Sequence, residues 1–255
     1  MNIFRNIVFL AVFAGIAAGI AMAGMQTFFT VPLILQAETF ENAEPAAPHD
    51  HGAAPAAATG EPAATAAAAA QEHEHEEGGW APADGAERIS FTLLANIVTG
   101  VGFALLLVVA SELSGGIAGW RQGLFWGLAG FAVFTLAPGL GLPPELPAMP
   151  AAELVPRQIW WVGTVAATAV GLWLMVFGGS GLLVLVGAVL IVVPHIIGAP
   201  QPVSHETPVP PNLHHSFVVA VTMTNLVFWL ALGAAIGFFR RRFTQSLGEP
   251  QGQFA

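Results

Sequence analysis

Six apolar stretches, each close to the length that crosses a lipid bilayer, dominate this sequence. A transmembrane helix needs roughly 20 consecutive apolar residues. Only 9% of the residues are charged, whereas about a quarter are charged in an average soluble domain. Because a helix satisfies its own backbone hydrogen bonds in lipid, the sequence predicts an all-α, multi-pass transmembrane bundle of about six helices. The stretches cover residues 7–31, 90–111, 120–138, 159–177, 181–198 and 216–239.

The first stretch has a second interpretation, in which it is a secretory signal peptide. Ala21-Met22-Ala23 fits the small-residue pattern of a signal cleavage site. The apolar run continues to about Leu35, however, which is longer than the apolar core of a signal peptide. We therefore expect a retained first helix; five helices remain if this segment is cleaved or counted differently.

The arginines predict the orientation of the bundle, because cytoplasmic flanks of membrane helices hold an excess of positive charge. With a cytoplasmic N-terminus, five arginines lie inside and two outside. The inner ones are Arg5, Arg121, Arg240, Arg241 and Arg242, and the outer ones are Arg88 and Arg157. We therefore expect both termini in the cytoplasm and the His-rich loop on the outer side.

The predicted organisation has four parts. They are a first helix (1–31), a largely disordered outer loop rich in His, Ala and Pro (32–89), a membrane bundle of about five helices (90–239) and a cytoplasmic tail (240–255). The low-complexity composition of the outer loop cannot bury a hydrophobic core. On this topology all eight histidines and fourteen of the sixteen acidic residues belong to the outer side.

Two tracts in the outer loop have the residue types that bind divalent transition metals, neutral imidazole and carboxylate. Residues i and i+2 of an extended chain point the same way, so each tract can chelate one ion through its two histidines. The tracts are His49-Asp50-His51 and His73-Glu74-His75. The alternative is that both are solvated low-complexity sequence. Such tracts do not identify the ion, since Cu²⁺, Ni²⁺ and Zn²⁺ generally outcompete Co²⁺.

His195 is the one histidine expected at membrane depth, within Val192-Val193-Pro194-His195. An ionisable residue there is costly and is by default a functional hypothesis, and Pro194 frees a backbone carbonyl nearby. The alternative is a histidine that is hydrogen-bonded to a neighbouring helix. Between the two, we favour His195 as the histidine through which an ion passes.

Further metal ligands are expected at the outer ends of the helices. Glu38 follows the first span, and the last outer loop contributes His205, His214 and His215. Adjacent helical residues do not face each other, so His214 and His215 are not expected to share an ion unless the loop is extended. A weaker set of pathway residues lies within the spans: Met22, Met25, Gln26 and Asn96.

Missing residue types exclude several activities. The chain has no cysteine and hence no disulfide and no thiol nucleophile, and no lysine for a nucleotide-binding Walker-A site. Gly178-Gly179-Ser180-Gly181 matches the G-x-S-G of intramembrane serine proteases. His195 lies fifteen residues further on, roughly 22 Å along a helix, so we interpret this motif as a turn. We expect no enzymatic activity.

Glycines spaced by four predict close helix packing, since small residues let helix backbones approach in lipid. The sets are Gly15/Gly19, Gly119/Gly123/Gly127 and Gly233/Gly237.

Several stretches resemble one family, the predicted cobalt transporter subunit CbtA of bacteria. They are VPLILQAETFE (31–41), WAPADGAERISFTLLANIVTGVGFALLL (80–107), GLFWGLAGFAVFTLAPGLGLPPELPAM (123–149), RQIWWVGTVAATAVGL (157–172) and VVPHIIGAPQP (192–202). The resemblance implies a cobalt transport component of the bacterial cytoplasmic (inner) membrane. It also implies a small one-span companion subunit (CbtB-like) that has its own histidines.

We therefore expect a component of a divalent transition-metal uptake system that captures Co²⁺ outside and passes it inward. Ni²⁺ and Zn²⁺ are alternative ions, and no tightly bound cofactor is expected. The alternative function is a membrane-anchored metal buffer or sensor that does not translocate. Besides membrane lipids and the companion subunit, a homo-oligomer is an open expectation, and no nucleic-acid partner is expected.

Overall fold

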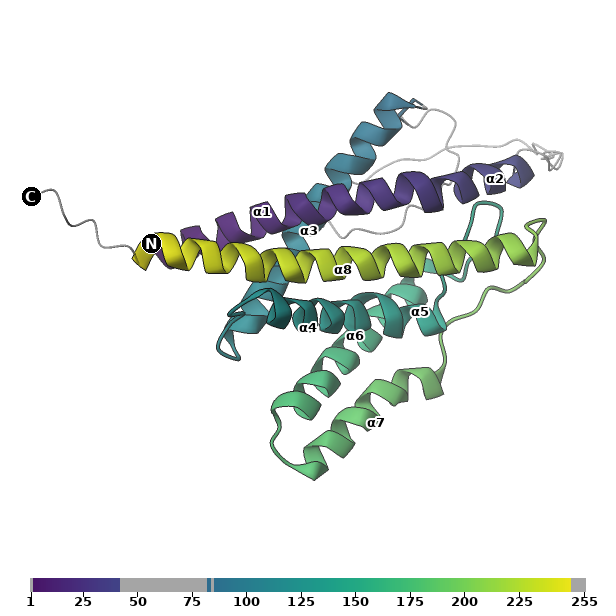
Figure 1. Ribbon diagram of the computed structural model, residues 1–255. Helices are drawn as coiled ribbons and strands as arrows, with labels where there is room; N and C mark the ends of the chain where they lie inside the picture. Colours follow the sequence, from purple (N-terminus) through teal and green to yellow (C-terminus); the bar gives the residue numbers. More distant parts are fainter. Residues whose placement is uncertain (1, 42–81, 84, 249–255) are drawn as a thin grey trace, which may run out of the picture.

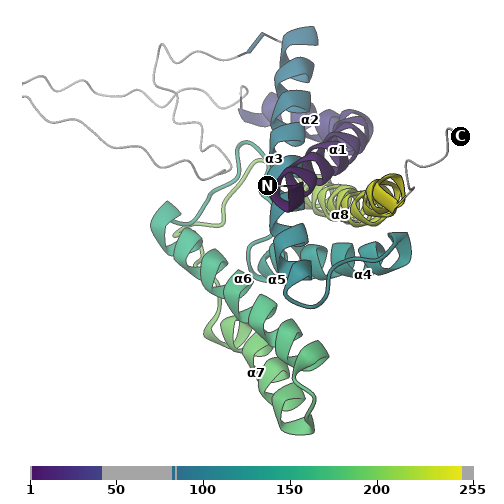
Figure 2. The ribbon, with the colours of Figure 1, turned by 90° about the vertical axis from the view of Figure 1, so that its left-hand side faces the viewer.

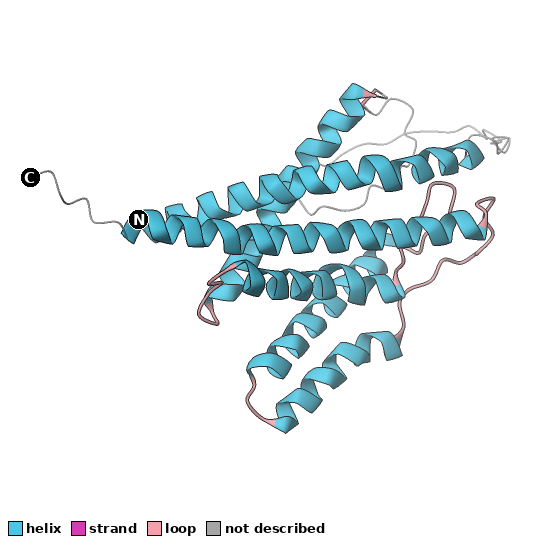
Figure 3. Ribbon diagram, in the orientation of Figure 1, coloured by secondary structure: helices cyan, strands magenta, loops and turns pink. Residues whose placement is uncertain are grey.

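The computed structural model describes residues 2–41, 82–83 and 85–248, and within these residues the chain forms helices and loops only (Figure 3). This confirms the all-α prediction. The elements are α1 (Asn2–Met25), the π-helix η1 (Gln26–Thr30), α2 (Val31–Glu41), α3 (Ala86–Glu112), α4 (Trp120–Phe131), the π-helix η2 (Ala132–Leu136), α5 (Ala137–Gly141), α6 (Leu154–Phe177), α7 (Gly181–Ile197) and α8 (Pro211–Gly248).

Five helical stretches are long and apolar enough to cross a membrane: Phe4–Glu41, Ala86–Glu112, Trp120–Gly141, Leu154–Phe177 and Pro211–Arg242. The remaining predicted span, 181–198, corresponds to α7, a shorter apolar helix of 17 residues. At 1.5 Å per residue α7 is about 26 Å long, slightly less than the roughly 30 Å of the hydrocarbon core. The chain is a multi-pass membrane protein.

The first helix is longer than the sequence analysis expected. We placed its end near residue 31, but α1, η1 and α2 run on without a break to Glu41. The π-helical turn explains why Pro32 does not stop the helix. Val31 N–H bonds to the carbonyl of Gln26 five residues back, so Pro32, which has no N–H, follows a turn where the regular α-helical pattern is already interrupted.

The long helices α1–α2 and α8 lie side by side and define two ends of the molecule (Figure 1). The start of α1 and the end of α8 lie at one end, hereafter the terminal end. At the other, the loop end, α2 and the start of α8 pack with the loops 142–153 and 198–210 around a small apolar core. Its buried members are Ala37, Leu146, Val209, Leu213 and Phe217.

Glycines mark the places where helices pack backbone to backbone, as their spacing predicted. A Cβ added to Gly19 of α1 would lie 2.7 Å from the Cα of Ile97 in α3. One added to Gly123 of α4 would overlap the carbonyl of Gly233 in α8. Since side chains essentially never approach backbone so closely, these positions require glycine. The predicted close packing is confirmed for Gly15/Gly19, Gly123/Gly127 and Gly233/Gly237, whereas a Cβ on Gly119 would have nothing within 4 Å.

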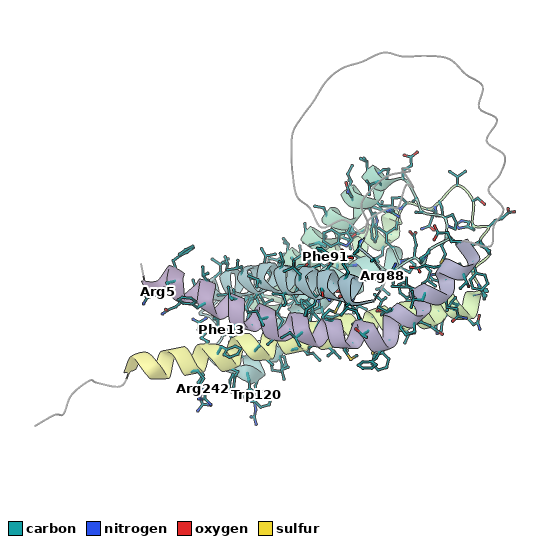
Figure 4. All side chains as sticks on the ribbon, turned by 90° about the horizontal axis from the view of Figure 1, so that it is seen from above. Arg5, Phe13, Arg88, Phe91, Trp120 and Arg242 are labelled. Carbon is teal, nitrogen blue, oxygen red and sulfur yellow. The ribbon has the colours of Figure 1, made fainter. Side chains whose placement is uncertain are left out.

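The arginines lie at the two ends of the bundle. Figure 4 shows Arg5 and Arg242 toward the terminal end and Arg88 toward the loop end. At the terminal end, a guanidinium nitrogen of Arg240 in α8 pairs with the carboxylate of Glu112, the last residue of α3. This ion pair joins α3 to α8 where α3 ends.

The α6–α7 hairpin projects away from the other helices, as the two perpendicular views show (Figures 1 and 2). Its two helices pack on each other through Gly171 and Gly187, where a Cβ on Gly187 would lie 2.5 Å from the carbonyl of Gly171. Large apolar side chains such as Leu182 and Ile196 are more than 70% exposed. In a membrane protein such a surface is satisfied by lipid tails.

Candidate metal pathway

The two predicted histidine tracts lie outside the described residues. His49, Asp50, His51, His73, Glu74 and His75 all fall within 42–81. They remain a prediction of the sequence. The other candidate residues are placed.

Glu38, expected as a ligand at the outer end of the first span, lies on α2 at the loop end. One of its carboxylate oxygens is 3.5 Å from a guanidinium nitrogen of Arg88 in the first turn of α3. Both side chains are about one third exposed, so this ion pair is solvated and weak. A cation that binds Glu38 must compete with an arginine already beside it.

A cavity at the loop end joins two of the predicted histidines. This loop-end cavity of about 140 Å³ lies between the loop after α5, the loop before α8 and the first turn of α8. His205 and His214 line it together with Glu145 and Met149. The last two were not predicted, because residues in the loop 142–153 gave no ligand pattern of their own.

The ring of His214 is fixed by one hydrogen bond to the backbone. Its Nε2 lies 3.2 Å from the backbone oxygen of Pro144. A carbonyl can only accept, so Nε2 carries the proton and Nδ1 keeps its lone pair. Metal-binding histidines commonly donate their other ring N–H to a carbonyl in this way. His215, the next residue of α8, is exposed and does not line the cavity.

The loop-end cavity does not hold a closed ligand set. Among the described residues, no three His, Asp or Glu side chains gather closely enough to hold a metal ion. The carboxylate of Glu145 lies 3.1 Å from a guanidinium nitrogen of Arg157 in α6.

His195 lies in the last turn of α7, and both of its ring nitrogens face carbonyl oxygens. Nε2 is 2.9 Å from the oxygen of Ala137, and Nδ1 is 3.0 Å from the oxygen of Ile191. The indole N–H of Trp160 in α6 donates to the Pro194 oxygen at 3.1 Å. A neutral ring donates to only one of these oxygens, and the other oxygen occupies the space in front of the second nitrogen. The geometry therefore favours the hydrogen-bonded alternative.

A second cavity lies within the bundle, between α1, α3, η2 and α8. This intramembrane cavity has a volume of about 110 Å³. Its polar lining comes from amides and hydroxyls on helices far apart in sequence: Asn96, Thr99, Thr135 and Asn225. Its apolar lining is Met22, Phe103, Phe134, Phe228 and Trp229.

Two of the weakly predicted pathway residues are joined at this cavity. The side-chain nitrogen of Asn96 in α3 donates to the side-chain oxygen of Gln26, the first residue of η1, at 2.6 Å. Met22 lines the cavity one turn earlier, whereas Met25 does not. Thr135, which the sequence analysis passed over, accepts a hydrogen bond from the indole N–H of Trp229 at 3.2 Å.

The G-x-S-G motif is a turn, as predicted. Ser180 immediately precedes α7, and its hydroxyl oxygen accepts a hydrogen bond from the backbone N–H of Leu183 at 3.3 Å, which caps the helix. His195 lies in the last turn of the same helix. The two residues are therefore at opposite ends of α7.

A family model of probable cobalt transporter subunits (CbtA) matches residues 4–241. The chain belongs to this family. The match covers every described helix except the last residues of α8 and the first residues of α1. Searches among curated proteins and among solved structures found no match. The family accordingly places the chain among membrane transporter subunits, with cobalt as the ion in its description.

Proposed function

We propose that the chain takes up Co²⁺ across the bacterial cytoplasmic membrane, capturing the ion at the loop end and passing it toward the terminal end. Family membership supports the role of transporter subunit. The observation that carries the finer proposal is the loop-end cavity, which His205, His214, Glu145 and Met149 line together and where the ring of His214 is fixed through Nε2.

The proposed direction follows from the arginines. Those of α1, α4 and α8 lie at the terminal end, and the positive-inside rule assigns that end to the cytoplasm. The loop end then faces outward, where the tracts around His49–His51 and His73–His75 collect ions and the carboxylate of Glu38 adds local negative charge. A divalent cation gains about 4.6 kcal/mol per 100 mV when it moves inward, twice the value for one charge.

Cobalt is proposed on the strength of the family description, because imidazole and carboxylate ligands such as those at the loop end generally bind Ni²⁺ and Zn²⁺ more tightly than Co²⁺. The ion is cargo, and no tightly bound cofactor is part of the proposal. A subunit implies a partner, for which we propose the small one-span companion (CbtB-like).

The second candidate function is a membrane-anchored metal buffer or sensor. At the loop end, Glu38 is paired with Arg88 and Glu145 with Arg157. Because these carboxylates already face arginines, the acidic and histidine-rich segment 42–81 is the part of the chain that attracts cations most strongly. A buffer binds metal at the surface and never internalises it.

Uptake of radioactive cobalt by cells tests the proposal with two neighbouring histidines. His214→Ala is expected to raise the cobalt concentration needed for half-maximal uptake several-fold, and a deletion of 49–77 is expected to do the same to a lesser degree. His215→Ala is the matched control, since it lies on the same turn outside the cavity. If the two histidine variants take up cobalt equally well, the loop-end cavity is not part of the pathway.

A further inference from the structure

The intramembrane cavity combines polar groups at a depth where such groups are costly and are usually functional. Its lining contains no charged side chain. The two amides, Asn96 and Asn225, come from α3 and α8. The cavity thus lies where the polar side chains of these two helices meet inside the bundle.

Hydrogen bonds decide which end of each amide faces the cavity. The side-chain nitrogen of Asn96 is engaged by the oxygen of Gln26 at 2.6 Å. That of Asn225 donates to the backbone oxygen of Val221 at 2.9 Å. Neither Gln26 nor Val221 lines the cavity, so the donors are directed elsewhere. Each amide is left with its oxygen, which accepts no hydrogen bond within the described residues.

The hydroxyl of Thr135 adds to the same polarity. The indole N–H of Trp229 already donates to it, and Thr135 is placed on the cavity by the π-helical turn η2. A second π-helical turn, η1, begins at Gln26 and so holds Asn96. Single π-helical turns within α-helices often occur at functional sites.

We propose that this cavity is a transient site for a partly hydrated divalent cation, bound through the neutral side-chain oxygens of Asn96 and Asn225. The inference rests on the proposed function and names the place where the ion is held within the bilayer. A volume of about 110 Å³ leaves room for water molecules beside the ion.

Neutral oxygens suit passage better than carboxylates would. They replace part of the hydration shell of the ion, yet they bind weakly enough to let it leave. A carboxylate at this depth would hold a divalent cation too tightly, because opposite charges attract strongly in a low dielectric. We therefore expect one added negative charge at this site to strengthen cobalt binding and to slow the passage of the ion.

The test is Asn225→Asp, which keeps the size of the side chain and its oxygen while adding a charge. In the purified full-length chain, equilibrium binding of radioactive cobalt is expected to gain affinity at one site by about tenfold or more, as a charge facing a divalent cation in low dielectric requires. In cells, the same variant is expected to lower the maximal uptake rate. Asn6→Asp is the matched control, because Asn6 of α1 lines neither cavity.

Asn225→Leu provides the second arm and is expected to lower the uptake rate while leaving cobalt binding at the loop end unchanged. If Asn225→Asp binds cobalt no more tightly than Asn6→Asp, and Asn225→Leu takes up cobalt like the wild type, the cavity is not a cation site. A wild type that takes up no cobalt instead contradicts the proposed function, and the binding comparison still reports on the cavity.

Discussion

The Nε2 atom of His195 lies 2.9 Å from the backbone oxygen of Ala137, and this contact ties α7 to the start of α5. Ala137 directly follows η2, whose Phe134 and Thr135 line the intramembrane cavity. The α6–α7 hairpin otherwise projects from the bundle (Figure 2). His195 is thus placed to fix the hairpin against one wall of that cavity.

Replacing His195 is therefore expected to loosen the hairpin. His195→Ala leaves the oxygen of Ala137 without its partner, which should lower the free energy of unfolding by about 1–3 kcal/mol. Thermal unfolding in detergent measures the change, with His215→Ala as a control that removes a histidine from an exposed position. An unchanged stability together with lost cobalt uptake would instead make His195 a ligand on the ion's path.

The close crossing of α4 and α8 gives a second prediction. Gly123→Ala is expected to destabilise the bundle by about 1–3 kcal/mol, the usual cost of overpacking, because the new methyl group meets the carbonyl of Gly233. Gly163→Ala of α6 is the control, since its Cβ would have nothing within 4 Å. Equal thermal stability of the two variants contradicts the described crossing.

The ion pair between Glu38 and Arg88 predicts opposite effects for its two members. Arg88→Gln removes a positive charge beside Glu38 and should lower the cobalt concentration for half-maximal uptake, by less than about fivefold for a solvated pair. Glu38→Gln should raise it. Arg5→Gln, at the other end of the bundle (Figure 4), controls for the change in net charge. If all three variants take up cobalt alike, the ion pair between Glu38 and Arg88 has no part in capturing the ion.

The proposed orientation can be tested because the natural chain has no cysteine. Ser204→Cys lies on an exposed position of the loop before α8, and Ala118→Cys on an exposed position of the loop before α4. A membrane-impermeant maleimide applied to intact cells is expected to label the first and spare the second. The reverse labelling pattern would show that the loop end faces the cytoplasm.

Helix existence and helix packing could be predicted from the sequence because both depend on local patterns. Long apolar runs predict spans, and the spacing of Gly15 and Gly19 predicts a close approach. The extension of the first helix to Glu41 was missed because Pro32 is normally a helix-breaking signal. Only the hydrogen bonding of η1 explains why Pro32 is tolerated within the helix.

The candidate sites could be predicted only in part, since they depend on contacts between distant segments. His205 and His214 were expected as ligands, but their meeting with Glu145 requires the packing of two loops. Gln26 and Asn96 are seventy residues apart, and nothing in either segment indicates that they bond. For His195, the sequence left two interpretations open that only the positions of Ala137 and Ile191 distinguish.

Movement of cobalt across the membrane tests the central claim most directly. Cells that produce the chain are given radioactive cobalt, and the amount that resists an EDTA wash is followed with time, before and after the membrane potential is collapsed. Transport predicts that EDTA-resistant cobalt accumulates in energised cells and that accumulation stops when the potential is lost. Cobalt that binds to the cells but is removed by EDTA at every time point would contradict transport and identify a surface buffer.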